Sequence, residues 1–313
     1  MKEKKIAVLL NPSAGKGKAI TFKKKLEHFL ASYNIQHDLY ITQSEENLRQ
    51  LTQDLSRKYD ILAAAGGDST FFIMVNEIMR CEHKPALGLI GLGSSNDISR
   101  EFHLVQLKKA CRAIKSGRTR TIDLGRIADD SGHICYFLGH ANIGLGTEVN
   151  RYVEKLFRKK PWLGKMQTLA GMLAVRSAYR RKEIPLALSV KTKQNRESAL
   201  YMAAVFSNIS FWATGRHLIP HARPDDGLLD ACLIKDCSLP KLVWLNLLAG
   251  KERHVHAAEL SFLKSQDFVV TSETPFAVQT DGEIIGGWQK PKTFTRISFE
   301  IAPRSLRIFS ETG

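Results

Sequence analysis

The sequence predicts two domains of different architecture. An α/β domain with a mostly parallel sheet is expected over residues 1–125, and a mainly antiparallel, β-sandwich-like domain over residues 126–302. The first observation behind this prediction is that short apolar runs alternate with helical patterns up to about residue 116. The second is that short strand-like runs dominate afterwards. The chain has 313 residues, which is enough to bury two cores.

Strands and helices alternate in the first domain. Ser44 precedes the second helix as a capping residue, with Glu45 and Glu46 in the first turn. The expected strands are 6–10, 37–41, 61–65 and 87–91, and the expected helices are 19–33, 45–58, 70–80 and 105–116. This alternation predicts a parallel sheet covered by helices on both faces, with ligand sites at the carboxyl ends of its strands.

The second domain is predicted from short strand-like runs and one clear helix. The helix is "SLPKLVWLNLLAG", with Ser238 near its start and Gly250 at its end. The pair Asp281-Gly282 between apolar runs is the usual signal of a two-residue hairpin. The expected strands are 134–138, 186–191, 200–206, 228–234, 268–271, 276–279 and 297–301.

Composition and charge narrow the class of protein. The chain is 43% hydrophobic and 25% charged, its five cysteines show no metal-ligand spacing, and no apolar run reaches the length of a membrane span. These features favour a globular protein of the reducing cytoplasm. The formal net charge of +15 indicates an anionic partner.

Much of the positive charge lies in one segment, residues 151–182. It carries ten Lys or Arg and one Glu, with apolar residues at helical spacing. We expect it to bind an anionic membrane surface peripherally, weakened by salt or by charge reversal at Arg158, Lys159 and Lys160. A core-packed helix with a solvated basic face is the alternative. Nucleic acid is disfavoured because no aromatic-rich strand pair accompanies the charge. The oligomeric state stays open, a homodimer included.

Three glycine-bearing turns follow strands of the first domain: "NPSAGKGK" (11–18), "GGDST" (66–70) and "GLGSSND" (91–97). Glycine lets the backbone approach a ligand, and the exposed N–H groups at helix N-termini attract phosphate. Three such turns at one sheet edge favour nucleotide binding over plain turns. Neither a Walker A loop nor a G-x-G-x-x-G fingerprint is present.

Carboxylates accompany two turns of the second domain. Asp281 and Glu283 lie at a strand end in "VQTDGEIIGG", where one of them can accept a proton during phosphoryl transfer to a hydroxyl. "RPDDGLLD" (223–230) is a second acidic turn. It is either an ordinary turn or a site for a hard cation bound through carboxylate and backbone oxygens.

Taken together, these motifs resemble the diacylglycerol kinase catalytic-domain family, and its bacterial lipid kinases in particular. "NPSAGKG" resembles NPxSGxG, "GGDST" resembles GGDGT, and "LGSSNDISR" resembles LGTxNDFAR. "IDLGRI", "DDGLLD" and "TDGEII" follow in the family's order, so the resemblance covers nearly the whole chain. GGD alone is shared with NAD kinases and phosphofructokinases, but the ordered set ending in DGE is specific to lipid kinases.

The resemblance implies a lipid kinase that uses ATP and Mg²⁺, with its active site between the two domains and residues 303–313 returning to the first domain. The acceptor hydroxyl would lose its proton to Glu283 or Asp281, with Glu283 preferred by analogy. A structural magnesium site would involve Arg223, Asp226 and Leu228. The ATP site would involve Asn11, Ser13, Gly15, Thr42, Gly66, Gly67, Asp68, Ser69, Thr70, Ser94, Asn96, Asp97 and Asp123, the last in an acidic network near the metal.

The chain departs from the family pattern beside the second glycine turn. Ser69 stands where GGDGT has glycine, and a positive φ there would cost serine about 1–2 kcal/mol. Phe72 and Ile73 replace a polar pair that is common in bacterial members. The alternative function is therefore an impaired nucleotide- or lipid-binding relative. A relative of NAD kinase acting on a soluble dinucleotide is a third hypothesis. The acceptor lipid cannot be named from the sequence.

Overall fold

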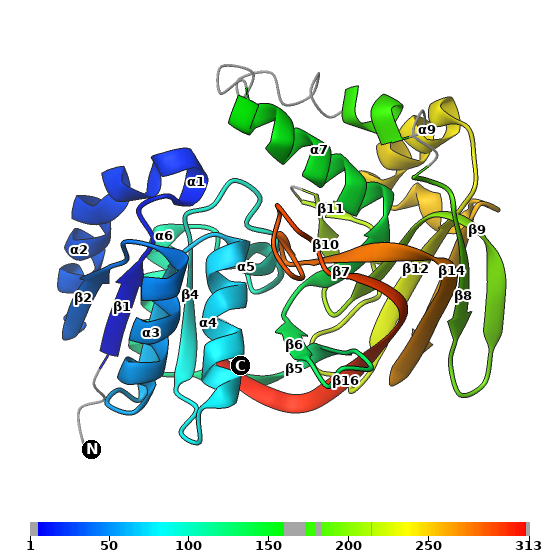
Figure 1. Ribbon diagram of the computed structural model, residues 1–313. Helices are drawn as coiled ribbons and strands as arrows, with labels where there is room; N and C mark the ends of the chain where they lie inside the picture. The colour runs from blue at the N-terminus through cyan, green and yellow to red at the C-terminus, as the bar shows by residue number, and fades with distance from the viewer. Residues whose placement is uncertain (1–5, 160–172, 179–182, 214, 311–313) are drawn as a thin grey trace.

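The computed structural model describes residues 6–159, 173–178, 183–213 and 215–310, without the side chains of 157–159. The chain forms an α/β domain, on the left in Figure 1, and a β-rich domain on the right. Both belong to one continuous 14-stranded sheet, with the order β13-β12-β9-β7-β14-β16-β4-β3-β1-β2 along its main path. The predicted fold class, α/β followed by β-sandwich-like, is confirmed.

The first domain is built on four parallel strands. They are β1 (Ile6–Leu10), β2 (His37–Ile41), β3 (Ile61–Gly66) and β4 (Ala86–Gly91). β1 and β3 are buried along their whole length because helices cover both sheet faces, as their uninterrupted apolar sequences predict. Their pairing in parallel brings the ends of β1, β3 and β4 to one edge of the sheet.

Helices and short turns connect these strands. Ser44 caps α3, because its hydroxyl accepts from the Asn47 amide at 3.1 Å, as predicted. The predicted helix 19–33 begins instead as a short 3₁₀ turn, η1 (Ala19–Phe22). The α-helices are α1 (Ala14–Gly17), α2 (Lys23–Ser32), α3 (Glu45–Ser56), α4 (Asp68–Arg80), α5 (Asp97–Glu101) and α6 (Leu107–Ser116).

The second domain is almost entirely antiparallel. The predicted runs 268–271 and 276–279 form one long strand, β14, whose pairing with β16 shifts register between Thr271 and Phe276. Its strands are β6 (Ile134–Phe137), β7 (His140–Gly144), β8 (Leu186–Lys191), β9 (Arg196–Ser207), β10 (Phe211–Trp212), β11 (Arg216–His217), β12 (Leu229–Lys235), β13 (Leu260–Ser265), β14 (Asp267–Thr280) and β15 (Glu283–Ile284).

Two helices and a 3₁₀ turn of this domain lie along the upper side of the molecule in Figure 1 or close to it: α7 (Leu145–Lys159), α9 (Leu239–Ala249) and η3 (Arg253–His256). The helix predicted from "SLPKLVWLNLLAG" is α9. Within the part of the chain that the structure describes, no helix is long and apolar enough to cross a membrane.

Two long strands, β5 (Thr119–Ala128) and β16 (Thr293–Phe309), run from one domain to the other as an antiparallel pair. At its start β16 pairs with β14 of the second domain, and near its end Ile308 pairs in parallel with Leu87 of β4. The chain therefore crosses between the domains through hydrogen-bonded strands.

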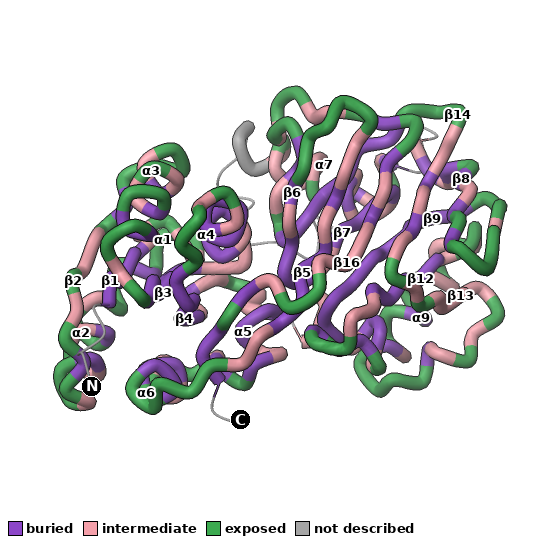
Figure 2. The backbone as a smooth tube through the Cα atoms, turned by 90° about the horizontal axis from the view of Figure 1, so that it is seen from below, coloured by how far each residue is buried: buried purple, intermediate pink, exposed green. Residues whose placement is uncertain are grey.

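Each domain has its own hydrophobic core, visible as buried elements in both halves of Figure 2. Phe72, at the start of α4, packs against both cores. Asn76, one turn later, donates to the Tyr136 carbonyl at 2.8 Å and accepts from the Tyr136 amide at 2.9 Å. The first turns of α4 are thus fixed to the second domain, and the apolar Phe72 and Ile73 serve packing.

Candidate active site

A cavity of about 990 Å³ lies at the carboxyl edge of the parallel sheet, between the two domains. Its polar wall comes from the three glycine-bearing turns. The facing wall comes from the β14–β15 hairpin, α7 and α9. The predicted site residues that line it are Asn11, Ser13, Gly15, Gly67, Asp68, Ser69, Thr70, Ser94, Asp97 and Asp281.

Glycine is required where the three turns touch one another. A Cβ on Gly93 would lie 2.6 Å from the Gly67 Cα, and a Cβ on Gly15 would lie 2.6 Å from the Leu92 carbonyl oxygen. Gly15 also has a φ of 60°, which favours glycine. The turns therefore pack backbone against backbone, and any side chain there would separate them.

Side-chain hydrogen bonds fix the shape of these turns. The Asn11 amide donates to Thr70 Oγ1 at 3.0 Å, which joins the turn after β1 to the start of α4. Asn96 adopts a left-handed conformation, with φ 54°, that asparagine tolerates. Its side chain accepts from the Gly93 amide at 2.8 Å and donates to the Gly93 carbonyl at 2.9 Å. Hydrogen bonds within the protein thus hold the turns of the polar wall together.

The β14–β15 hairpin closes the cavity from the second domain. Asp281 and Gly282 both have positive φ, 43° and 92°, as the predicted two-residue turn requires. The Asp281 carboxylate accepts three backbone N–H groups, from Leu138 at 2.7 Å, His140 at 2.9 Å and Gly139 at 3.0 Å. Both of its oxygens are therefore occupied, and it anchors the hairpin to the turn between β6 and β7.

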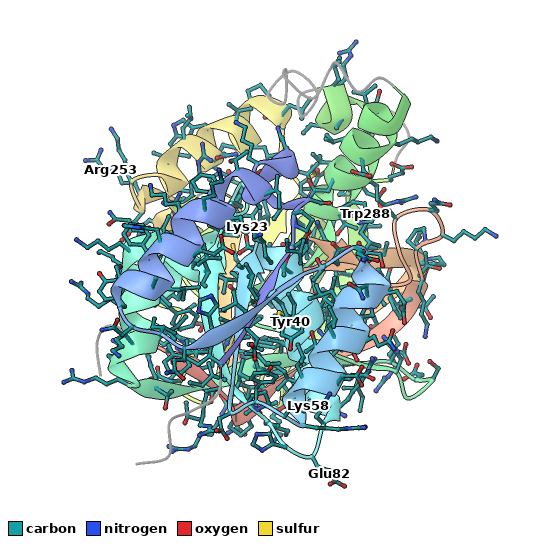
Figure 3. The ribbon with its side chains drawn as sticks, turned by 90° about the vertical axis from the view of Figure 1, so that its left-hand side faces the viewer. Lys23, Tyr40, Lys58, Glu82, Arg253 and Trp288 are labelled. Carbon is teal, nitrogen blue, oxygen red and sulfur yellow. The ribbon has the colours of Figure 1, made fainter. Side chains whose placement is uncertain are left out.

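Glu283 is held differently, by side chains from both domains. Trp288 Nε1 donates to Glu283 Oε2 at 3.1 Å, and the Ser69 hydroxyl donates to the same carboxylate. Trp288 lies beside the upper end of α3 in Figure 3. Glu283 does not itself line the cavity, but Ser69 and Gly282 do. The carboxylate is therefore next to two residues of the cavity lining, Ser69 in space and Gly282 along the chain.

Ser69 lies within α4 and is not among the residues with positive φ. The expected backbone strain is therefore absent at this position. An ideal Cβ on Gly282 would lie 3.1 Å from Ser69 Oγ, so the hydroxyl also packs closely on the hairpin. Ser69 connects the first domain to the hairpin of the second, which a glycine at this position could not do.

Three carboxylates share the centre of the site: Asp68, Asp97 and Asp281. Removal from water, then the charges of Asp281 and Asp97, raises the pKa of Asp68 to about 7. Burial raises the pKa of Asp281 to about 6 against the lowering effect of its three N–H donors. Asp68 Oδ1 is buried and has no hydrogen-bond partner. This concentration of negative charge would be relieved by a cation.

Burial also lowers the pKa of His140 to about 4, so its ring is neutral at pH 7. The pKa of Glu283 is raised, first by burial and then by the charge of Glu45, while Ser69, Trp288 and Arg49 lower it. A carboxylate with a raised pKa is a better proton acceptor than an exposed one.

The remaining wall is apolar. α7 contributes Leu145 and Val149, and α9 contributes Leu242 and Leu245. α7 is attached to β14 by a hydrogen bond of 2.9 Å between Asn150 and Gln279. A cavity with phosphate-type turns at one end and aliphatic side chains at the other suits a ligand that is charged at one end and apolar along the rest.

Several predicted residues lie outside the cavity lining. Gly66 and Asn96 support the turns: a Cβ on Gly66 would meet the Thr70 side chain at 2.3 Å. Thr42 is buried beside β1, where its hydroxyl donates to the Leu10 carbonyl at 3.4 Å. Asp123 accepts from the amides of Gly227 and Arg304, both at 2.7 Å, so it joins β5 to the turn before β12 and to β16 at its register shift.

The turn expected to hold a structural magnesium ion contains a salt bridge instead. Lys264 Nζ lies 2.8 Å from Asp226 Oδ2 and 3.4 Å from Asp230 Oδ2. Asp226 also accepts from the Leu228 amide at 3.1 Å. The Lys264 ammonium therefore compensates both carboxylates in this structure, and the magnesium site with Arg223, Asp226 and Leu228 stays a prediction. No cluster of three or more His, Cys, Asp or Glu side chains suited to a metal exists among the described residues.

Sequence reasoning missed other residues of the site. Gly93 and Ser95 lie in a predicted turn but were not expected as site residues, although Ser95 donates to Asp97 at 2.6 Å. His140, Trp288 and the α7 and α9 wall carry no local motif. They are recognised only because the folded chain brings them close to the glycine turns. Residues 160–172 and 179–182 of the expected membrane-binding segment lie outside the described residues.

The fold and the cavity are those of a class of two-domain kinase, built from an α/β domain and a β-sandwich-like domain with a cavity between them. Residues 5–127 match the diacylglycerol kinase catalytic domain, and residues 139–310 match the YegS C-terminal NAD kinase beta sandwich-like domain. The chain therefore belongs to the diacylglycerol kinase catalytic-domain family. It is a lipid kinase by class, a phosphotransferase with an alcohol group as acceptor.

Similar proteins agree with this assignment along the whole chain. A diacylglycerol kinase of Staphylococcus saprophyticus is 24% identical over 303 residues, 95% of this chain and 94% of that protein. A diacylglycerol kinase of Bacillus subtilis is 23% identical and covers 90% of this chain and 91% of its own. A crystal structure described as a diacylglycerol kinase from Bacillus anthracis str. Sterne has a similar fold, with a TM-score of 0.72 at 17% identity over 100% of this chain and 98% of that one.

Proposed function

We propose that the protein transfers the γ-phosphate of ATP, bound with Mg²⁺, to the hydroxyl of a lipid such as diacylglycerol. One observation carries this proposal: a single cavity joins the glycine turns at one end to the apolar side chains of α7 and α9 at the other. A soluble dinucleotide would use the first end but would leave the second unsatisfied. The names of the similar proteins support the same acceptor class.

The glycine turns would hold the triphosphate. Backbone N–H groups at the start of α4, and in the glycine turns that follow β1 and β4, favour negative charge at this edge of the sheet. Asp68 would hold the magnesium ion that accompanies ATP, because its Oδ1 is buried and unpaired. Mg²⁺ is commonly bound by one or two carboxylates together with substrate phosphates, and it would spread charge from the γ-phosphate.

Glu283 is the preferred proton acceptor, because both oxygens of Asp281 are already occupied by backbone donors. As the lipid oxygen bonds to the γ-phosphorus, its proton passes to the Glu283 carboxylate. The bond between the γ-phosphorus and the β–γ bridging oxygen breaks, and ADP leaves with that electron pair. Ser69 and Trp288 hold the carboxylate in place.

An impaired relative is the less favoured alternative. Two observations argue against impairment. Ser69 lies in helical backbone without strain, and its hydroxyl interacts with the Glu283 carboxylate. The protein would act as a peripheral enzyme at the cytoplasmic face of an anionic membrane, where its net charge of +15 favours binding.

The test is a transfer assay with labelled ATP, Mg²⁺ and anionic vesicles that contain diacylglycerol, phosphatidylglycerol or a sphingoid base, with NAD as a soluble acceptor. We expect label on a lipid hydroxyl, lost in Glu283→Gln and kept in the exposed control Glu82→Gln. Label on NAD alone, or on no acceptor at all, would contradict the proposal.

A further inference from the structure

Helix α9 exposes an unusual amount of apolar surface. Apart from Pro240, Lys241 and Asn246, all of its residues are apolar. Leu247 is 66% exposed, Val243 60% and Trp244 46%. These positions are spaced by three or four residues with Pro240, so they form one stripe on the outer face of the helix. We call Val243, Trp244 and Leu247 the α9 stripe.

The opposite face of the same helix lines the cavity. Leu242 and Leu245 contribute to the apolar wall, and Val243 belongs to both the wall and the stripe. The segment 173–178 repeats this arrangement, because Leu173 is 44% exposed while Val175 lines the cavity. One layer of side chains thus separates the apolar end of the cavity from the exterior.

Basic groups flank the stripe. Lys251 and Arg253 are exposed just beyond the end of α9, and Figure 3 shows Arg253 pointing away from the molecule. At the start of the helix, Lys241 lies 4.6 Å from the centre of the Trp244 ring while pairing with Glu259 at 2.9 Å. An amphipathic tryptophan beside cations is typical of a residue at the interface between lipid headgroups and acyl chains.

An anionic bilayer fits this surface better than a second copy of the chain. Three part-exposed side chains present on the order of 300 Å², whereas a stable protein interface buries about 800 Å² on each partner. A bilayer needs no such area, because apolar insertion and attraction between Lys or Arg and anionic lipid add to each other.

We propose that the α9 stripe inserts into the acyl region of an anionic bilayer and so brings the apolar end of the cavity to the membrane. The proposal rests on the proposed lipid kinase function, because the α9 stripe would supply the route by which the acceptor lipid enters the cavity. It differs from the expectation for residues 151–182, because insertion of apolar side chains resists salt and attraction of a basic segment does not.

Trp244 provides the direct readout. The protein is mixed with anionic phosphatidylglycerol vesicles that carry bromine at defined depths along the acyl chains, and tryptophan fluorescence is measured. We expect quenching that is stronger with bromine in the upper acyl chain than at the bilayer centre. Trp244→Phe should lose most of this quenching. Equal quenching with and without Trp244, or no quenching while the protein is vesicle-bound, would overturn the proposal.

Affinity gives a second, independent readout. The double variant Trp244→Ser with Leu247→Ser should bind these vesicles at least about tenfold more weakly in high salt. Ile134→Ser is the matched control, because Ile134 is 39% exposed on β6, which pairs with β5 and lies in the lower half of Figure 1, whereas α9 lies in the upper half. Equal loss in the control, or no loss in the double variant, would contradict insertion.

The double variant also separates this proposal from the proposed function, because neither side chain lines the cavity. It should phosphorylate a short-chain, dispersed lipid at the unchanged rate and lose activity on vesicles. If neither the unchanged protein nor the double variant phosphorylates a lipid, but Trp244 of the unchanged protein is still quenched, membrane insertion of the α9 stripe is supported and the lipid kinase function is contradicted. If dispersed and vesicle lipids are phosphorylated equally well by the double variant, the surface has no role in entry.

Discussion

The two walls of the cavity are made in opposite ways. The wall of the first domain consists of backbone: glycines within contact distance of one another, and an asparagine that reproduces backbone hydrogen bonds. The wall of the second domain consists of side chains on α7 and α9, where only size and polarity matter. The difference teaches that the end proposed to bind phosphate is fixed by backbone geometry, whereas the end proposed to bind lipid is an apolar volume that many sequences can line.

The largest expected effect follows from a change in the polar wall. Asp68→Asn should lower kcat about 10²–10³-fold, because the site loses the carboxylate proposed to hold Mg²⁺. In the absence of nucleotide at pH 8, the same variant should have a free energy of unfolding about 1–3 kcal/mol higher. The reason is that the Asp68 carboxyl has a folded pKa of about 7, above its unfolded value, so its ionised form destabilises the folded state. Transfer kinetics and thermal melts measure both effects.

The sign of the stability effect is checked by pH. A carboxyl whose pKa is raised by folding destabilises the folded state increasingly as pH rises from about 4 to 7, so the difference between Asp68→Asn and the natural protein should vanish below pH 4. Asp54→Asn, on the exposed side of α3, is the control and should change neither quantity. A destabilised Asp68→Asn at pH 8 would argue against the crowded acidic cluster.

The next effect tests whether backbone contact shapes the polar wall. Gly93→Ala places a Cβ 2.6 Å from the Gly67 Cα, so the two turns must separate. We expect the KM for ATP to rise about tenfold or more, because separated turns can no longer hold the phosphates together. A tenfold rise corresponds to a loss of about 1.4 kcal/mol of binding free energy. Gly250→Ala is the control, since its added Cβ would meet only the Leu247 carbonyl at 3.4 Å. An unchanged KM for ATP in Gly93→Ala would show that the turns do not act as one unit.

A smaller effect concerns the contact between the walls. Ser69→Ala and Ser69→Gly should both lower kcat/KM, by about threefold to tenfold, because the net contribution of one hydrogen bond is about 0.5–1.5 kcal/mol. Since the Ser69 hydroxyl lowers the pKa of Glu283, its removal raises that pKa and moves the acid limb of the rate profile to higher pH.

Two further variants sharpen this prediction. Trp288→Phe removes the other donor to Glu283 and should move the acid limb in the same direction. Ser69→Thr keeps a hydroxyl and should preserve the profile. A large gain of activity in Ser69→Gly would support the impaired-relative hypothesis instead.

How far the sequence could predict the site depends on the wall. Gly15, Gly67 and Asp68 occur in short motifs whose local geometry is encoded by neighbouring residues, so their position at the sheet edge follows from the strand order. Leu242 of α9 is brought to the same cavity only by pairing of distant strands. The Ser69 strain was predicted from a motif, but its backbone is helical because α4 begins one residue earlier, at Asp68.

The same distinction explains the fold. Short apolar runs predicted the parallel strands closely because both of their faces are buried. β7 was missed because "HANIG" contains polar and small residues that suit its place beside the hairpin. The bulge that joins 268–271 to 276–279 was also missed, since exposed residues such as Glu273 interrupt the apolar pattern without interrupting the strand.

The central claim is that one cavity binds a triphosphate on the first wall and a lipid on the second. A diacylglycerol analogue with a diazirine near the end of one acyl chain tests it most directly, through cross-linking in the presence of a non-hydrolysable ATP analogue and mass spectrometry of the peptides. We predict labelling of 145–150 and 239–249, competed by unlabelled lipid. Competed labelling confined to the glycine turns, or none in those two segments, would contradict the claim.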